Sequence, residues 1–275
     1  GGYICISVCT AAKRLKIPYI IHESNVLPGV ATKMLSKNAE KILVGFEEAK
    51  NRLPKAKKIV FTGTPTKVKK LNLTKAQIDS KKQELGFTQE KPLVLVFGGS
   101  QGAQSINISM TNIIKNTMNT NYQIIWAAGP EQYEKVKQDL QKENIDIDKL
   151  KGIKVMPYIY NMEEIMNIAD LIVSRSGAMT VTEIENVGKP AIFIPFPFAA
   201  ENHQEYNARV LEKQGAAKVI LDKNLTAEAL NATINELAKD RSALEQMGKN
   251  AHKLSTENVE DKIYEEIKII KNNKA

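Results

Sequence analysis

The chain has 275 residues, 43% hydrophobic and 25% charged, so it can form one large or two medium α/β domains, and wholesale disorder is excluded. Its net charge of +8 is uneven, because residues 1–91 hold 18 Lys and Arg against 7 Asp and Glu, whereas residues 92–275 hold 21 against 24. The cations are nearly all Lys and the single Trp lies outside the basic part, which argues against nucleic acid. An anionic membrane surface or a phosphorylated lipid fits the charge better, and a solvated Lys-rich surface explains it equally well.

The start of the chain reads as a loop that enters a helix. Because the first residue is Gly1 rather than Met, we expect a preceding segment to be absent. Cys5 and Cys9 lie four residues apart on this helix without a CxxC motif, so two buried thiols are expected rather than a zinc site or a disulfide framework. No run of about 18 apolar residues or signal peptide is visible.

Short apolar runs then alternate with helical patterns along the chain. Most runs are continuously apolar, as in parallel strands that are covered on both faces, and the alternation predicts doubly wound parallel sheets. The expected strands are 18–22, 42–46, 59–63, 93–97, 123–127, 153–156, 171–174, 191–195 and 218–221. The expected helices are 30–37, 103–116, 131–143, 162–169, 179–187, 203–213, 227–239 and 259–271, and Asn161 with Glu164 is expected to form a capping box.

A domain break is expected near residues 64–91, which are Lys-rich and lack an apolar strand. A new sheet of about six strands starts after it, whereas the first 63 residues supply only three strands, too few for an independent Rossmann-like domain. The predicted organisation is an incomplete N-terminal domain at 1–66, an interdomain region at 67–91, a C-terminal domain at 92–256, and a segment at 257–275 that packs back on the first domain.

The strongest local motif is the run GGSQGA at residues 98–103, where a buried strand turns into a helix. Backbone N–H groups and the positive end of the helix dipole form a phosphate site at such a turn, and Ser100 can add a hydroxyl. The glycine order is not GxGxxG and no P-loop Lys follows, so neither NAD nor ATP is indicated. A tight strand-to-helix turn without a ligand is the alternative.

Two further motifs follow strands of the same predicted sheet. In SRSGAMTVTE, residues 174–183, Glu183 could accept both hydroxyls of a ribose, or it could face solvent; Arg175 could pair with a pyrophosphate or with a carboxylate. In the run from Ile194 to Asn207, the groups of His203 and Gln204 suit hydrogen bonding to a sugar, although a His at a helix start is often only a cap.

In the basic part, the turn HESN at residues 22–25 places four polar groups beyond a strand, and His22 and Glu23 could do acid–base work. HESN, GGSQGA, SRSGAMTVTE and the NHQ run, in this order along the chain, resemble the MurG family of glycosyltransferases from residue 1 to about 271. The resemblance implies a GT-B fold, that is, two facing Rossmann-like doubly wound parallel-sheet domains. The N-terminal domain would be incomplete.

The resemblance also implies roles for individual residues. Ser100 would contact the donor phosphates, the Ile159 backbone would recognise uracil, and Glu183 would bind the ribose hydroxyls. Gln204 and Asn25 would contact the donor. The remaining implied cleft positions are Lys67, where the family usually has Arg, together with Asn107, Arg175, His203, Ala178, Met179, Thr180, Val181 and Thr182. The main catalytic base would precede Gly1, which leaves His22 and Glu23 as the candidates in this chain.

The implied reaction is inverting transfer of N-acetylglucosamine (GlcNAc) from UDP-GlcNAc to undecaprenyl-linked lipid I, which gives lipid II. No metal or other cofactor is expected. The implied location is the cytoplasmic face of the bacterial membrane, as a peripheral protein. A nucleotide-sugar-binding fragment or subunit that is inactive without an N-terminal half, and a related glycolipid glycosyltransferase, stay open as alternatives. An NAD-dependent enzyme is disfavoured because GxGxxG is absent.

Overall fold

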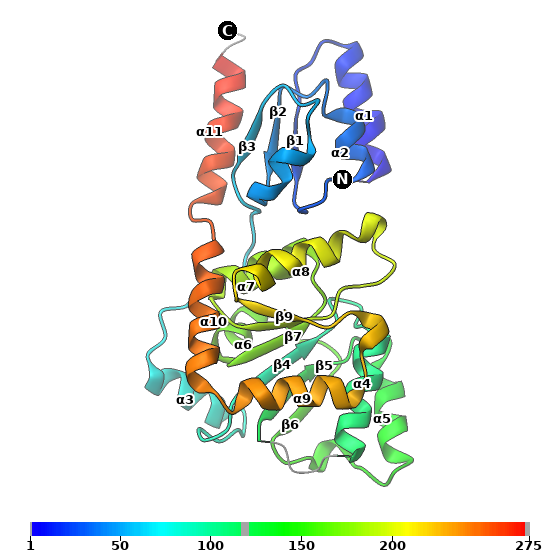
Figure 1. Cartoon of the computed structure of the whole chain (residues 1–275), viewed down its shortest axis with the longest axis vertical. Coiled ribbons are helices and arrows are strands. Elements are labelled where there is room, and N and C mark those ends of the chain that lie inside the picture. The colour runs from blue at the N-terminus through cyan, green and yellow to red at the C-terminus, as the bar shows by residue number, and fades with distance from the viewer. Residues whose placement is uncertain (1, 117–120, 273–275) are drawn as a thin grey trace.

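Two parallel sheets, one above the other in Figure 1, organise the chain, and the computed structural model describes residues 2–116 and 121–272. Gly1 and residues 273–275 of the expected domain segments lie outside the described residues. The expected α/β class and the parallel arrangement of both sheets are confirmed.

The first sheet has three strands in the order β1-β2-β3. Its strands are β1 (Ile20–Glu23), β2 (Lys41–Val44) and β3 (Ile59–Phe61), and its helices are α1 (Tyr3–Arg14), α2 (Val30–Leu35) and the 3-10 helix η1 (Glu47–Arg52). The residues of β2 are all buried because this strand is central. No residue of α1 is buried, and Cys5 and Cys9 are half-buried thiols outside any disulfide, rather than the buried thiols expected.

The second sheet has six strands in the order β6-β5-β4-β7-β8-β9, as many as the sequence predicts. Its strands are β4 (Leu93–Phe97), β5 (Gln123–Ala127), β6 (Ile153–Met156), β7 (Leu171–Ser174), β8 (Ala191–Phe193) and β9 (Ala217–Val219). Alternate residues of β4 enter two different hydrophobic clusters, because the strand is covered on both faces.

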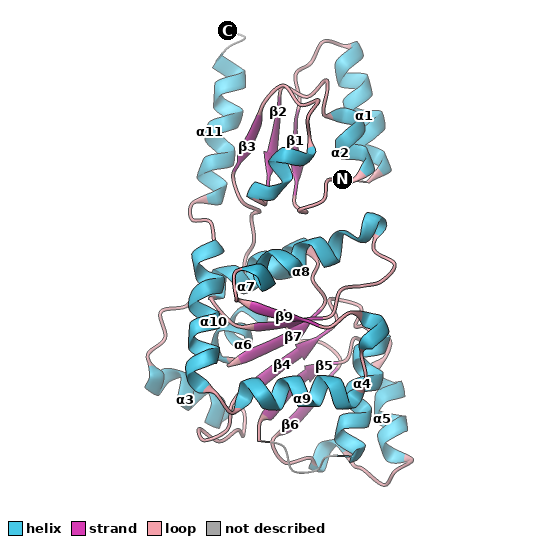
Figure 2. Ribbon diagram, viewed as in Figure 1, coloured by secondary structure: helices cyan, strands magenta, loops and turns pink. Residues whose placement is uncertain are grey.

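Helices cover both faces of this sheet (Figure 2). On one face lie α4 (Gln104–Asn116), α5 (Tyr133–Gln141) and α9 (Ala227–Ala238). On the other lie α3 (Lys75–Glu84), α6 (Met162–Ile168), α7 (Ala178–Val187) and α8 (His203–Lys213). The connections between strands and helices of this half include three short 3-10 helices, η2 (Ile147–Lys149), η3 (Ala200–Asn202) and η4 (Asp222–Asn224).

The last two helices run along both halves of the molecule. α10 (Arg241–Leu254) packs against α7, and α11 (Val259–Asn272) continues beside the first sheet (Figure 1). The ammonium of Lys41, on β2, lies 2.5 Å from the carboxylate of Glu266 on α11. Val26 and Phe46 of the first half belong to the hydrophobic cluster of the second, so the two halves share a core. The exact domain boundaries stay a prediction.

Two local expectations differ from the structure. Asn161 makes no capping bond to the backbone of α6, and its amide instead contacts the side chain of Glu164 at 3.1 Å, so the expected capping box is wrong. A capping box is present at α3, where Thr74 and Gln77 bond reciprocally. The strand expected at 191–195 ends at Phe193, because Pro195 has no N–H for a ladder bond.

None of the helices within the described residues is both long and apolar enough to cross a lipid bilayer.

Candidate donor-binding cleft

Three of the predicted motifs meet at one edge of the six-stranded sheet. They follow β4, β7 and β8, which are neighbouring parallel strands, so their carboxyl ends lie side by side. A cavity of about 500 Å³ opens there. Its walls include Gly98, Gly99, Gly102, Ser105, Arg175, Gly177, Thr180, Phe196, Phe198, Gln204 and Asp222. The expected convergence of the three loops is therefore confirmed.

The glycine turn owes its shape to close backbone packing. A Cβ on Gly98 would lie 2.2 Å from the Ala103 nitrogen, and one on Gly102 would lie 2.2 Å from the Ala128 carbonyl oxygen. Gly102 also has φ +77°, which disfavours other residues. The turn delivers the N-terminus of α4 to the cavity, and Ser100 is exposed on the turn. Free N–H groups at such a helix start suit a phosphate.

Arg175 fastens the cavity wall rather than standing free in it. Its guanidinium donates to the carbonyls of Ile194 and Pro195 at 3.0 and 3.1 Å, and to Ser105 Oγ at 2.9 Å. It also lies 2.5 Å from the carboxylate of Asp222. The side chain is largely buried, so the arrangement joins the loops after β7 and β8 to α4 and η4. Of the two sequence interpretations, the pairing with a carboxylate is the one observed.

The second helix start at the cavity belongs to α7, where Gly177 is the N-cap and provides no capping side chain. Along this helix Thr180 lines the cavity and Met179 is 44% exposed, whereas Val181 and Thr182 are buried. Ala178, the first residue of α7, is only partly buried.

Glu183 lies one turn further along α7, where Thr66 Oγ1 donates to its carboxylate at 3.2 Å. Partial burial raises the pKa of this carboxyl, and the Thr66 bond opposes that rise. Thr66 comes from the segment between the sheets, so Glu183 lies at the junction of the two halves and not on an open surface.

The loop after β8 is held by the side chain of Gln204, whose Oε1 accepts from the Phe196 N–H at 3.0 Å. His203 donates from Nδ1 to the carbonyl of Ala200 at 2.8 Å, so its ring holds the preceding turn and caps no N–H of α8. Phe196 and Phe198 pack edge to face and are 41% and 84% exposed, which leaves apolar surface at the cavity rim.

The HESN turn is organised by the buried carboxylate of Glu23. One oxygen accepts from the backbone and side-chain N–H groups of Asn25, at 3.0 and 3.1 Å. The other accepts from the Gly29 N–H at 3.0 Å and from Thr32 Oγ1 at 2.6 Å. Both oxygens are thus occupied by bonds that shape the loop.

His22 is engaged on both ring nitrogens. Its Nε2 lies 2.9 Å from the carbonyl oxygen of Gly63 and therefore carries the hydrogen. Nδ1 is then the acceptor for Ser24 Oγ, at 3.3 Å. These bonds tie the end of β1 to the segment that follows β3.

Asn207, which was not among the expected site residues, joins the two halves at the cleft. It is fully buried in α8, and its Oδ1 accepts from the Val26 N–H at 2.9 Å. Its Nδ2 donates to Asn25 Oδ1 at 3.1 Å and to the Ser176 carbonyl at 3.2 Å. Asn207 thus connects the HESN turn with the SRSG turn. This contact was not predicted because the motifs lie far apart in the sequence.

Three expected residues lie apart from this cluster. Asn107 is buried beneath the glycine turn, where it bonds Ala128, Gln132 and Trp126. Ile159 is buried in the core beyond β6, and Lys67 is exposed in the segment between the sheets.

The comparisons with known proteins agree on one family. A model of the glycosyltransferase family 28 C-terminal domain matches residues 93–263, and a model of the family 28 N-terminal domain matches residues 1–44. The curated relatives are UDP-N-acetylglucosamine–N-acetylmuramyl-(pentapeptide) pyrophosphoryl-undecaprenol N-acetylglucosamine transferases. One from Acetivibrio thermocellus is 41% identical over the whole chain and 73% of its own length, and one from Thermoanaerobacter sp. is 42% identical over 98% of the chain and 72% of its own length.

Among solved structures, MurG of Acinetobacter baumannii is similar with a TM-score of 0.77 and 29% identity. The match covers 98% of this chain and 72% of that one. The likeness confirms the expected GT-B architecture of two facing parallel-sheet domains.

Proposed function

This chain belongs to glycosyltransferase family 28 and to its MurG transferases, and from that premise we propose that its cleft carries out GlcNAc transfer to lipid I. It is a hexosyltransferase that uses UDP-GlcNAc and forms lipid II in peptidoglycan biosynthesis. The observation that carries the proposal is the convergence of two helix N-termini on one cavity, beside which Asn207 joins the HESN turn to Ser176.

We assign the donor pyrophosphate to the N-terminus of α4, beside Ser100 and the glycine turn. The helix dipole and the free N–H groups there offset the charge that develops on UDP as it leaves. Lys67, which follows Thr66 in the sequence, adds an exposed cation. Transfer in this scheme requires no metal ion.

The nucleoside end lies along α7 in this assignment. The Glu183 carboxylate accepts hydrogen bonds from the ribose hydroxyls, which replace the bond from Thr66. The backbone at Ile159 recognises uracil. The GlcNAc group then lies towards Gln204 and Asn25, whose side chains already form the rim and the interdomain contact.

Transfer proceeds by direct displacement with inversion. The acceptor hydroxyl oxygen bonds to the anomeric carbon, the bond from that carbon to the phosphate oxygen breaks, and the acceptor proton passes to a general base. Because the polar atoms of Glu23 and of His22 are all engaged in loop contacts, we propose that these two residues position Asn25.

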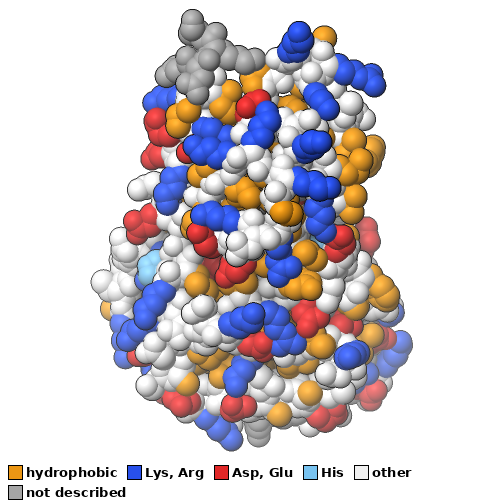
Figure 3. All heavy atoms as spheres, turned by 45° about the horizontal axis from the view of Figure 1, so that its top comes forward, with side chains coloured by type: hydrophobic (Ala, Val, Ile, Leu, Met, Phe, Trp, Pro, Cys, Tyr) orange, Lys and Arg blue, Asp and Glu red, His pale blue; other side chains and the backbone are white. Residues whose placement is uncertain are grey.

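We also propose that the first half meets an anionic membrane surface, as lipid I requires. Large apolar side chains are exposed on α1 and α2, including Tyr3 (81%), Val8 (62%) and Met34 (60%). Figure 3 shows Lys and Arg side chains spread over this half among hydrophobic ones. Apolar contact and cation attraction together suit a lipid headgroup region.

Calorimetric titration of the chain with UDP-GlcNAc, with NAD and GDP-mannose as controls, tests the donor assignment. Selective binding supports it, and equal or absent binding in a protein that melts cooperatively would reject it. Transfer of labelled GlcNAc to lipid I tests the reaction itself. Donor binding without transfer would favour the alternative of a nucleotide-sugar-binding subunit.

A further inference from the structure

A second cavity, of about 850 Å³, lies at the other edge of the six-stranded sheet. Pro92 and Asp170 line it, and they precede β4 and β7, whereas the donor loops follow these strands. A five-residue strand spans about 17 Å, so the two cavities are separated by the length of the strands. The size falls in the range of small-molecule sites, which is about 300–1,000 Å³.

The lining of this cavity is strongly basic. Nine Lys and Arg residues line it against four Asp and Glu residues. Two of the acids are already engaged, since the Asp170 carboxylate accepts from Lys82 at 2.6 Å and from the Leu93 N–H at 2.7 Å, and Glu245 lies 3.7 Å from Arg241. The acids therefore leave most of the positive charge in the cavity unneutralised.

Lys189 is the least favourably placed cation of this set. Burial, together with the nearby charges of Lys82 and Lys70, lowers the pKa of its ammonium to about 8, and Asp170 opposes that change only partly. Within the described residues, its ammonium has no hydrogen bond or ion pair. A half-buried cation without a bonded partner is costly, and an anion in the cavity would reduce that cost.

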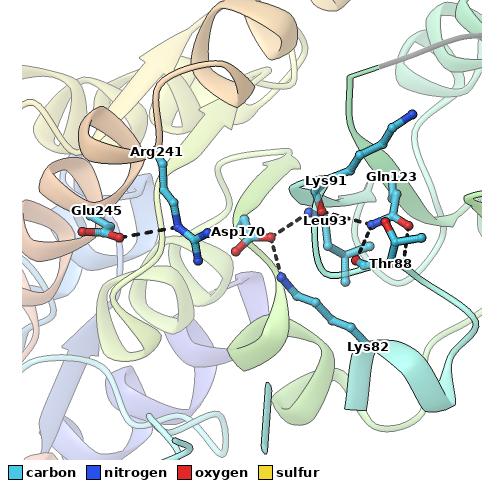
Figure 4. A network of polar contacts seen from close by, with 8 residues as sticks. All are labelled: Lys82, Thr88, Lys91, Leu93, Gln123, Asp170, Arg241 and Glu245. Carbon is cyan, nitrogen blue, oxygen red and sulfur yellow. Dashed lines mark hydrogen bonds and ion pairs between the residues drawn. The ribbon is translucent and has the colours of Figure 1, made fainter. Parts of the chain in front are cut away.

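The walls of the cavity are fixed by tight contacts. Gln123 Nε2 donates to the carbonyls of Thr88 and Lys91 at 2.9 and 3.0 Å, which holds the loop before β4. On the opposite wall a Cβ on Gly248 would lie 2.6 Å from the Gly188 carbonyl oxygen, so α10 lies directly on the end of α7. Figure 4 shows Lys82 and Arg241 approaching Asp170 from opposite sides.

We propose that this cavity is a second anion site, which binds a small molecule carrying two or more phosphate groups. Lys189 forms its half-buried floor, and Lys249 and Lys253 of α10 form its exposed rim. A multivalent anion suits the excess of cations better than a single carboxylate does. The ligand would brace α10, the helix that leads into α11 beside the first sheet.

Calorimetric titration with sodium pyrophosphate tests the proposal. The titration uses the chain with Gly102→Ala, which obstructs the donor turn without adding a phosphate ligand, and ionic strength is matched with KCl. We expect one site, with a Kd raised at least tenfold in Lys189→Met. The double substitution Lys249→Gln with Lys253→Gln, which changes only exposed side chains, is expected to raise it about threefold to tenfold.

Lys154→Met, at an exposed position of β6 outside the cavity, is the matched control and should leave the Kd unchanged. Equal loss in the control would show nonspecific charge attraction and overturn the proposal, as would pyrophosphate binding that Gly102→Ala alone abolishes. Sulfate binding as tightly as pyrophosphate at the same ionic strength would also overturn it. If Lys189→Met does not fold, the double variant alone decides, and an unchanged Kd there rejects the site.

Discussion

Replacement of Glu183 by Ala gives the sharpest test of the donor cleft. Among the described residues its carboxylate accepts one side-chain bond, from Thr66 at 3.2 Å, so capacity remains for two ribose hydroxyls. Hydrogen bonds that involve a charged group contribute about 1.5–3 kcal/mol each. In the variant, water takes over part of the hydrogen bonding to the ribose hydroxyls. We therefore expect a net loss of binding free energy of about 1.5–3 kcal/mol, which is roughly a 10- to 150-fold higher Kd for UDP-GlcNAc.

The same carboxylate makes donor binding depend on pH. Partial burial raises the pKa of Glu183 above its usual 4.5, and only the ionised form accepts from both hydroxyls. Affinity should therefore fall as the pH is lowered from neutrality towards this raised pKa. Glu183→Gln keeps one acceptor oxygen and should lose this pH dependence, with a smaller loss of affinity than Glu183→Ala.

Titration calorimetry with UDP-GlcNAc between pH 5 and 8 measures both effects. Glu236→Ala, on the exposed side of α9, is the matched control and should bind like the unmodified chain. Unchanged affinity in Glu183→Ala, in a protein with an unaltered melting temperature, would refute the ribose assignment. Retained pH dependence in Glu183→Gln would assign that dependence to another group.

Three other predictions test the packing around the cleft. Asn207→Ala leaves the buried Val26 N–H without its acceptor and should lower the free energy of unfolding by about 2–4 kcal/mol in urea titrations; a change below 0.5 kcal/mol would contradict the bridging role. Burial raises the pKa of Glu185 well above 4.5, so stability is greatest below the unfolded-state pKa and falls as pH rises. Glu185→Gln should then raise the Tm at pH 8 by about 2–4 °C, and an equal rise at pH 4 would argue against ionisation as the cause. Gly102→Ala and Gly86→Ala share the strain of positive φ, but only the first meets a backbone atom at 2.2 Å, so only the first should weaken UDP-GlcNAc binding tenfold or more; equal effects would reject the steric argument.

Most of the fold follows from the sequence because the strands of the second sheet are buried on both faces. Leu93–Phe97 is continuously apolar, and its predicted bounds match the structure. α3 was not predicted, since it is mostly polar, with Ala76 and Ile78 as its apolar residues, and only Lys82 among its residues is fully buried. α10 buries only Leu244, Gly248 and Ala251, a stripe too narrow to be recognised from its apolar residues alone.

The site could be predicted only as separate motifs. Each motif revealed its own strand-to-helix turn, because glycines and a following helix are local signals. The contacts of Asn207 with Val26 and Asn25 join residues more than 180 positions apart, and nothing local indicates them. The sequence also could not show whether Arg175 binds a ligand or forms part of the wall, because its partner Asp222 lies 47 positions away in the chain.

The two halves of the cleft depend on one another unequally. The first sheet has a fully buried cluster of its own of only five residues, Ala39, Ile42, Val44, Ala49 and Leu53. Its Val26 and Phe46 instead enter the large cluster of the second sheet, and α11 supplies Glu266 to Lys41. Because a core of this size contributes little free energy of folding, the first half is stabilised mainly by its contacts with the second sheet's cluster and with α11. Local opening should therefore begin there, and donor groups on α4 and α7 should stay ordered while Asn25 moves away.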